Sequence, residues 1–425
     1  MAKDKENQEV ELEVFDYLEV RGKIREYIIN TFDISLMEEA EFLHEVKKVV
    51  FSYTRRFEEI TYLKRKKLVF DLVNMTKGLG ILEELINDAS VSEIMVNGTD
   101  YIFIEQHGEL FQSEYKFETN EELQGIIQRI AGRVNRQINI SSPIVDARWK
   151  GMRVNAVFPP ISLNGATLTI RKFPENPMTM SDLVDYNSIT EEAAEFLHKL
   201  VLAKYNVFIS GGTGSGKTTF LNILSNFIPE DERVITIEDS AELQIRSVKN
   251  LVAMETRTSG DNDKVKISMK DLIKSSLRMR PDRIVVGEVR GQEAIDMLQA
   301  MNTGHDGSLS TGHANSAIDM LTRLESMVLM GVELPIDAIR QQISSAISIV
   351  VHLGRLRDKS RRILEIIEIT GYKNNEYQSQ SLFKFEEDKS AYTDEESKKK
   401  VVGKLVRTDN KLFNDEKMSM AGLEI

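Results

Sequence analysis

The stretch that decides the fold is residues 207–228, VFISGGTGSGKTTFLNILSNFI. It opens with β-branched and aromatic residues typical of a strand and closes with an apolar pattern typical of a helix. Between them lies G-x-x-x-x-G-K-T, from Gly211 to Thr218, which forms a phosphate-binding loop when it stands between a strand and a helix. The sequence therefore predicts an α/β domain organised around a nucleotide phosphate site.

The residue types of this loop suit phosphate binding. Glycines allow backbone N–H groups to approach the phosphates without a Cβ in the way, and the helix N-terminus adds a favourable dipole. We expect Lys217 to reach the β- and γ-phosphates and Thr218 to ligate Mg²⁺. The nucleotide-binding residues predicted from the loop are Gly211, Gly212, Thr213, Gly214, Ser215, Gly216, Lys217, Thr218 and Thr219. The loop alone does not distinguish a kinase, a GTPase, a transporter ATPase and a helicase.

Two more strand patterns are followed by an acidic residue. Residues 234–237, VITI, run into Glu238, and residues 284–287, IVVG, run into Glu288. Carboxylates at the C-terminal ends of parallel strands lie beside the phosphate site, where they can orient Mg²⁺ through water or polarise an attacking water. His313 lies in STGHAN, residues 310–315. It could sense a γ-phosphate by hydrogen bonding, although by itself it is typical of an ordinary loop histidine.

The chain before the loop begins with helical patterns. Over residues 1–79 apolar positions recur at intervals of three and four, which predicts a small helical bundle. Between Lys47 and Lys67 this region turns basic. We interpret the basic cluster as a solvated helix face, with contact to anionic lipid or to a partner as the alternative.

The rest of the chain divides further. Strand patterns around a hairpin turn at Asn97-Gly98 begin a mixed α+β region, and strands alternate with helices after Tyr205, as in a mostly parallel sheet. The tail is polar and charged, so we expect a loosely ordered segment with a short closing hairpin or helix. The predicted parts are a helical bundle at 1–79, an α+β domain at 80–173, a linker at 174–190, a P-loop α/β domain at 191–370 and a tail at 371–425.

Composition excludes several classes of protein. With 55 basic and 67 acidic residues the net charge is −12, which argues against a uniformly basic nucleic-acid binder. The chain has no cysteine, which excludes disulfides, iron–sulfur clusters and cysteine zinc sites. The sequence contains no run of 18 apolar residues, so it predicts no membrane-spanning helix. The polar N-terminus lacks the apolar core of a signal peptide. These features favour a reducing cytoplasm.

Four motifs in order resemble a known family. They are GGTGSGKTT at 211–219, VITIEDSAEL at 234–243, LRMRPDRIVVGEVRGQEA at 277–294 and STGHANSAIDMLTRLE at 310–325, which look like the Walker A, Asp, Walker B and His boxes of the secretion ATPase superfamily. Upstream, residues 93–110 and 141–173 resemble that superfamily's N-terminal domain. The branch that the chain most resembles is the CpaF/Tad type, which powers Tad (Flp) pilus assembly.

The resemblance implies a fold, an activity and partners. The α+β domain would be PAS-like and the P-loop domain RecA-like. The protein would be a homohexameric ring that hydrolyses ATP with Mg²⁺ at the inner face of the cytoplasmic membrane. It would associate with the membrane through partners, chiefly an inner-membrane platform protein, and would not bind nucleic acid directly.

The resemblance also implies roles for particular residues. It places catalytic roles on Glu288, Glu238, Lys217, Arg153, Arg171 and His313, and metal-binding roles on Thr218, Glu238 and Glu288. Which of Glu238 and Glu288 is the general base stays open. Arg153 and Arg171 would offset charge on the transferring phosphate, and Arg148 is a weaker candidate for nucleotide binding. No role is assigned to Arg278, Arg280, Arg283 or Arg290. They could line the ring or pair with acids, and we interpret them as structural.

Other functions compete with the pilus motor. The runner-up is the energising ATPase of a type IV secretion or conjugation system, which shares the four boxes. The absence of cysteine separates the chain from secretion ATPases that carry a tetracysteine zinc insertion. The net charge argues against a nucleic-acid translocase. The upstream strand domain argues against a small-molecule P-loop kinase. The full set of nucleotide-site residues argues against a catalytically inactive scaffold.

Overall fold

The computed structural model describes residues 15–34, 37–57, 59–106, 108–173, 177–257, 266–392 and 399–424. The chain divides into two compact units, Met1–Phe173 and Pro174–Ile425. Predictions that fall on the first 14 residues, on the first residues of the linker and on the middle of the tail lie outside the described residues. The finer boundary at residues 79 and 80 stays a prediction.

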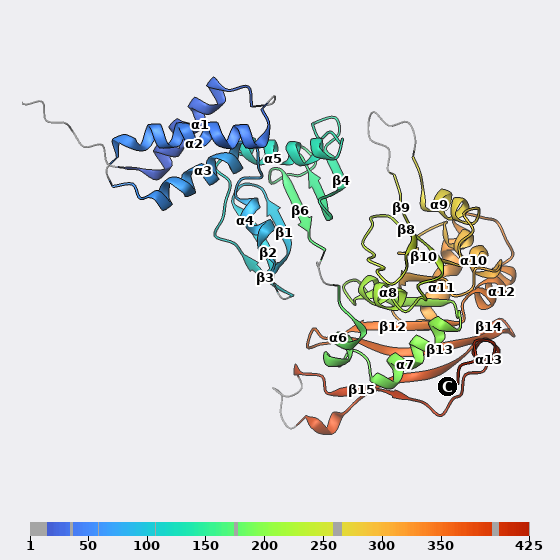
Figure 1. Cartoon of the computed structure of the whole chain (residues 1–425). Helices are drawn as coiled ribbons and strands as arrows, with labels where there is room; N and C mark the ends of the chain where they lie inside the picture. Colours follow the sequence, from blue (N-terminus) through green and yellow to red (C-terminus); the bar gives the residue numbers. More distant parts are fainter. Residues whose placement is uncertain are drawn as a thin grey trace, which may run out of the picture. The chain divides into compact units, whose positions relative to one another are not determined.

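The first unit begins with three helices that pack side by side (Figure 1). They are α1 (Tyr17–Thr31), α2 (Glu39–Tyr53) and α3 (Tyr62–Thr76), with a short 3-10 turn, η1 (Thr54–Arg56), after α2. Their apolar residues at intervals of three and four form one core, for example Ile24, Val46 and Leu72. The predicted helical character of this region is therefore confirmed in the described residues.

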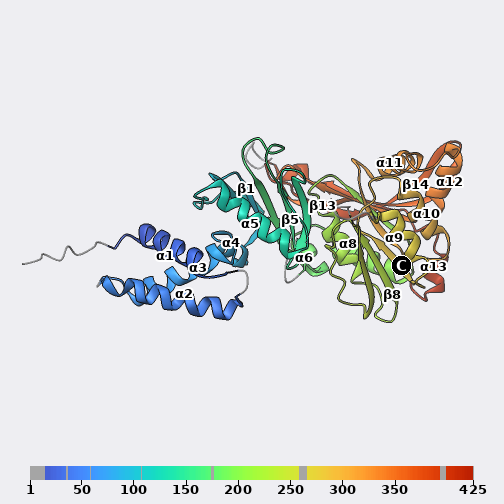
Figure 2. The ribbon, with the colours of Figure 1, turned by 90° about the horizontal axis from the view of Figure 1, so that it is seen from above.

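A six-stranded antiparallel sheet completes the first unit. Its elements are α4 (Leu82–Asn87), β1 (Val91–Asn97), β2 (Tyr101–Gln106), β3 (Glu109–Gln112), α5 (Asn120–Arg133), β4 (Ile144–Trp149), β5 (Met152–Val157) and β6 (Thr167–Arg171), in the sheet order β3-β2-β1-β6-β5-β4. Helix α5 packs its apolar side on one face of the sheet (Figure 2). The predicted hairpin at Asn97-Gly98 joins β1 and β2, whereas β4 was not anticipated from the sequence.

The second unit is built on a nine-stranded sheet. Its strands are β7 (Val207–Gly211), β8 (Arg233–Glu238), β9 (Asn250–Glu255), β10 (Arg283–Val286), β11 (Leu309–His313), β12 (Ile349–Arg355), β13 (Arg361–Lys373), β14 (Glu376–Glu387) and β15 (Gly403–Arg407). The order is β15-β14-β13-β12-β7-β11-β10-β8-β9, with every pair from β12 to β9 parallel. The predicted mostly parallel sheet is thus confirmed, with β7 at its centre.

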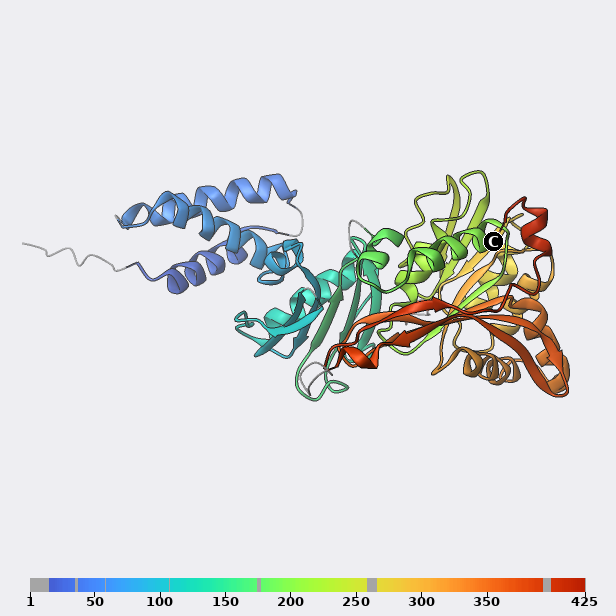
Figure 3. The same cartoon turned by 90° about the horizontal axis from the view of Figure 1, so that it is seen from below.

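Helices cover both faces of this sheet (Figure 3). They are α6 (Met180–Asp185), α7 (Glu191–Leu202), α8 (Lys217–Ser225), α9 (Met269–Ser276), α10 (Ala294–Asn302), α11 (Ala317–Leu329), α12 (Ile336–Ala346) and α13 (Glu416–Met420), and a 3-10 turn, η2 (Lys389–Ala391), follows β14. Helices α7, α8 and α13 share one apolar core, and α9 to α12 share the other. This layering is typical of α/β proteins.

The tail corrects the sequence analysis. We expected a loosely ordered segment from Gly371 onward with a short closing hairpin or helix. The closing helix is α13, but β13 continues to Lys373 and pairs with the long strand β14, which in turn pairs with β15. Leu382 and Phe383 of β14 are buried in the core that also holds α7. The many charged residues of this segment led to the wrong prediction, because its strands also carry apolar side chains that pack against the P-loop domain.

No helix in the described parts of the chain is both long and apolar enough to cross a bilayer.

Candidate active site

The phosphate-binding loop has the predicted strand–loop–helix context. Strand β7 is buried throughout and ends at Gly211, and α8 begins at Lys217. A Cβ on Gly211 would lie 2.5 Å from the carbonyl oxygen of Leu353, so only glycine fits there. Gly214 and Gly216 have φ angles of +71° and +95°, which other residues adopt only with strain. The loop therefore needs glycine for both space and backbone conformation.

Lys217 links this loop to the histidine box. Its Nζ donates hydrogen bonds to the carbonyl oxygen of Gly212 at 3.0 Å and to Nδ1 of His313 at 3.2 Å. An ammonium group has three hydrogens, so a third donor is available to a phosphate oxygen. Burial lowers the pKa of Lys217, and the nearby Glu288 carboxylate opposes that shift. The lysine is thus positioned by two protein acceptors.

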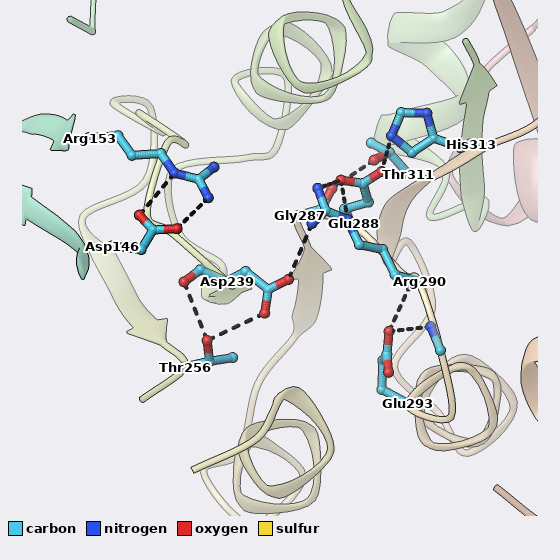
Figure 4. Close-up of polar contacts among 11 residues, drawn as sticks. Asp146, Arg153, Asp239, Thr256, Gly287, Glu288, Arg290, Glu293, Thr311 and His313 are labelled. Carbon is cyan, nitrogen blue, oxygen red and sulfur yellow. Dashed lines mark hydrogen bonds and ion pairs between the residues drawn. The ribbon is translucent and has the colours of Figure 1, made fainter. Parts of the chain in front are cut away.

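His313 connects the lysine to the Walker B acid. Its Nε2 lies 2.7 Å from Oε1 of Glu288 (Figure 4). Because Lys217 can only donate, Nδ1 must accept and the ring proton must lie on Nε2, which defines a neutral tautomer. Burial is the main cause that lowers the pKa of His313, with Lys217 and Arg290 adding to it and Glu288 opposing it. Neutral imidazole is therefore the form that the hydrogen bond from Lys217 requires.

Arg290 completes the chain at the other carboxylate oxygen. Its Nε and Nη2 lie 2.9 and 2.5 Å from Oε2 of Glu288 (Figure 4). Its Nη1 lies 4.0 Å from Oδ2 of Asp239. The backbone N–H groups of Arg290 and Gly291 donate to Oε1 of Glu293, which holds the turn after β10. Arg290, to which the sequence assigned no site role, is therefore part of the same network.

Glu238 has a different environment from Glu288. It is 4% exposed, and its Oε1 accepts the backbone N–H groups of Glu242 and Leu243 at 2.9 and 3.0 Å. A Cβ on Gly287 would lie 2.9 Å from Cγ of Glu238, so the residue before Glu288 has to be small. Glu238 thus anchors the loop after β8, and its close packing explains the glycine in the Walker B strand.

The predicted magnesium ligands are compatible with that ion. Thr218 is half-buried in the first turn of α8, and Thr219 is exposed. No group of three or more acidic or histidine side chains in the described ranges could hold a metal unaided. Mg²⁺ is usually bound by one or two protein oxygens together with phosphates and waters, so the hard oxygen donors of Thr218, Glu238 and Glu288 fit it without a dedicated cage.

The three arginines predicted in the first unit lie in one row across its sheet. Arg148 of β4 is directly opposite Arg153 of β5, Arg153 is opposite Arg171 of β6, and Arg171 is opposite Glu93 of β1. Cross-strand partners share a face, and this face is the one turned away from α5. Arg153 donates to both carboxylate oxygens of Asp146, at 3.3 and 2.9 Å (Figure 4). The register brings together residues that are dispersed in the sequence.

Several residues at the loop were not anticipated. Nε of Arg361, at the start of β13, donates to the carbonyl oxygen of Gly214 at 2.9 Å. Nδ1 of the buried His352 lies 2.7 Å from Oγ of Ser210, immediately before the loop. Neither residue belongs to a motif, and both are brought to the loop only by the sheet. A cavity of about 440 Å³ adjoins the loop and is lined by Gly212, Thr213, His313, Ala314, Asn315, Asp319, Thr322, Arg323 and Ser326.

Known proteins resemble this chain over most of its length. The profile of the family described as type II/IV secretion system protein matches residues 75–410. An uncharacterised protein of Methanocaldococcus jannaschii is 42% identical over 289 residues, which make up 65% of this chain and 39% of that protein. The conjugal transfer protein TrbB of Rhizobium radiobacter is 34% identical over 310 residues, 71% of this chain and 91% of TrbB.

A solved structure shows the same fold. The crystal structure of the pilus retraction motor PilT with bound ADP matches with a TM-score of 0.50 and 18% identity, over 81% of this chain and 87% of PilT. At that identity the match establishes the architecture alone.

Proposed function

The chain belongs to the type II/IV secretion system protein family, and on that premise we propose that it hydrolyses ATP to drive a pilus-assembly or secretion machine. The observation that carries the proposal is the continuous chain of contacts from Lys217 through His313 to Glu288. It joins the residue that holds the phosphates to an acid able to accept a proton.

We assign the general base to Glu288. In the hydrolytic step a water oxygen attacks the γ-phosphorus, the bond to the β-phosphate oxygen breaks, and the water proton passes to the carboxylate. Glu288 is connected through His313 to the lysine that binds the phosphates. Glu238 instead has one oxygen engaged by two backbone N–H groups. The link to the phosphate-binding lysine favours Glu288 as the base, and the two backbone hydrogen bonds give Glu238 the role of holding the neighbouring loop.

The magnesium ion and the arginines belong to the proposal as well. Mg²⁺, when bound, would neutralise charge on the β- and γ-phosphates, with Thr218 and, through water, the two glutamates as its protein oxygens. Arg153 and Arg171 are proposed to act on the charge that develops during phosphoryl transfer, and Arg148 to assist nucleotide binding. Their common row on one sheet face is consistent with a shared anionic target.

Pilus assembly of the Tad type is our first choice for the machine. It is supported by the helical bundle before residue 75, where the family match begins. We propose that the protein works as a homohexamer on an inner-membrane platform protein, from the inner face of the cytoplasmic membrane, and without direct contact to nucleic acid.

A type IV secretion or conjugation machine is the second candidate. A specific observation favours it, because the similarity to TrbB spans 91% of that conjugal transfer protein. The two candidates share the same chemistry and differ only in what the hydrolysis moves.

The test is a Lys217→Ala substitution at the native locus, with Lys373→Ala as the control, since Lys373 is exposed on β13, away from the loop. Surface pili are imaged and DNA transfer is scored in the same strains. Loss of thin pili with normal transfer supports the pilus motor. Normal pili with lost transfer or secretion assigns the protein to type IV secretion, and normal pili together with normal transfer and secretion would overturn both.

A further inference from the structure

The outer face of α3 carries large apolar side chains that the bundle does not cover. Tyr62, Leu63 and Phe70 are 59%, 76% and 47% exposed. At about 100° per residue they share an arc of about 140° with Lys66 and Lys67. The residues that α3 buries, Leu68, Val69, Leu72 and Met75, lie on the opposite side of the helix. Helix α3 therefore has hydrophobic residues on two faces. The bundle core accounts for the buried face and leaves the exposed face unexplained.

This face, which we call the α3 outer face (Tyr62, Leu63, Lys66, Lys67 and Phe70), is also basic. None of its five residues is acidic, and neither lysine pairs with a carboxylate among the described residues. Residues 54–70 contain six basic and two acidic residues in a chain whose net charge is −12. This segment is therefore positively charged, whereas the protein as a whole is negatively charged.

The aromatic and basic groups of this region are close together. Nζ of Lys66 lies 5.1 Å from the ring centre of Tyr62. On the adjoining 3-10 turn, the guanidinium of Arg56 lies 4.1 Å from the ring centre of Tyr53. Lysine and tyrosine side chains have apolar bodies and polar ends, which suits them to a boundary between water and an apolar phase. A face on which large apolar side chains and lysines are interleaved matches such a boundary.

We propose that the α3 outer face binds the surface of an anionic lipid bilayer. A helix face that combines large apolar residues with lysines can lie in the headgroup region, where the apolar side chains enter the acyl boundary and the cations meet lipid phosphates. The face is the outward side of a helix held rigidly by α1 and α2. An outward helix face can lie against a flat surface, whereas an acidic peptide would need a groove to be held in a defined position.

The inference goes beyond the proposed function. The family match begins at residue 75, so it leaves out nearly all of α3. Lipid binding by this face would not depend on ATP hydrolysis or on the identity of the machine. The protein would then reach the membrane directly and not only through a platform partner.

The experiment measures co-sedimentation of the full-length protein with vesicles. Vesicles of phosphatidylcholine with phosphatidylglycerol are compared with vesicles of phosphatidylcholine alone. We expect binding to the anionic vesicles, and we expect it to weaken strongly between about 0.1 M and about 0.5 M salt because ions screen the attraction. Equal binding to both vesicles, or binding to neither, would overturn the proposal.

Two variants separate the charged and apolar contributions. Lys66→Gln with Lys67→Gln should weaken binding about 25-fold, at roughly fivefold per lysine near an anionic surface. Lys373→Gln with Lys384→Gln removes the same charge from exposed sites in the second unit and should change binding less than about threefold, because these lysines lie outside the α3 outer face. Leu63→Ser with Phe70→Ser should also weaken binding, and circular dichroism checks that the helices persist.

The remaining outcomes are equally decisive. If the control pair weakens binding as much as the α3 pair, attraction is non-specific and the assignment to this face is wrong. If the α3 variants lose binding to a poly-glutamate peptide while vesicle binding is unchanged, the face serves an acidic protein partner instead. ATP turnover should be unaltered in every variant, because none touches the P-loop network.

Discussion

The two units of the chain use their charged residues differently. In the second unit, two groups of charged residues are largely buried and paired with one another, namely Lys217, His313 and Glu288, and Arg283 and Glu232. In the first unit, the arginine row and the α3 outer face leave several cations exposed. Enclosed charges define one geometry, whereas exposed charges are available to a ligand or a surface. Substitutions should therefore disturb folding or chemistry in the second unit, and transition-state or surface contacts in the first.

The largest effect is expected at the buried ion pair between Arg283, the first residue of β10, and Glu232. Arg283 is fully buried, with Nε 2.6 Å from Oε2 of Glu232. Arg283→Met should lower the free energy of unfolding by about 3–5 kcal/mol, because Glu232 would lose its main partner. Chemical denaturation checks this value. Adding Glu232→Leu should recover part of the loss, and a single variant as stable as the parent would show that the pair is not structural.

The next largest effect separates the two acids. Glu288→Gln should lower kcat by about 10²–10⁴-fold, because the amide cannot accept the proton of the attacking water. Glu238→Gln should cost less than about tenfold, since its oxygen can still accept both backbone hydrogen bonds. Steady-state ATP hydrolysis compares the two. A greater loss in the Glu238 variant would transfer the role of base to that residue.

Arg171→Ala examines the exposed row of the first unit. If this arginine acts on charge in the transition state, turnover should fall by about 10-fold or more while nucleotide affinity changes less. Titration with a fluorescent nucleotide measures affinity separately from hydrolysis. An equal loss of both would indicate a structural arginine, and Arg148→Ala provides the matched comparison within the same row.

The smallest effect concerns pH. The pKa of His313 is below its ordinary value of 6.5, mainly because of burial. Its Nδ1 must be unprotonated to accept from Lys217, so activity should fall only as pH drops below about 6.5. Stability should fall in the same range, because the unfolded state then binds the proton more readily. The acid limb should disappear in His313→Ala, and a limb that persists there would belong to another group.

Local sequence was enough to predict the elements whose signals are short. The P-loop, the strands that lead to Glu238 and Glu288, and the helical start of the chain follow from spacing and periodicity, and the structure has them. Strands β14 and β15 were not foreseen, because their charged surface residues outweigh the apolar ones in composition. Their burial depends on a core to which α7 contributes from a distant part of the chain.

What the sequence determined by itself is the set of chemical groups at the nucleotide site, because each motif requires its residue types within a few positions. Only the tertiary structure decided which groups meet. Lys217 and His313 are 96 residues apart and come together because β11 pairs with β7. Arg361 reaches the loop across 147 residues for the same kind of reason. Sheet order and register are set by packing over the whole unit, and no local pattern contains that information.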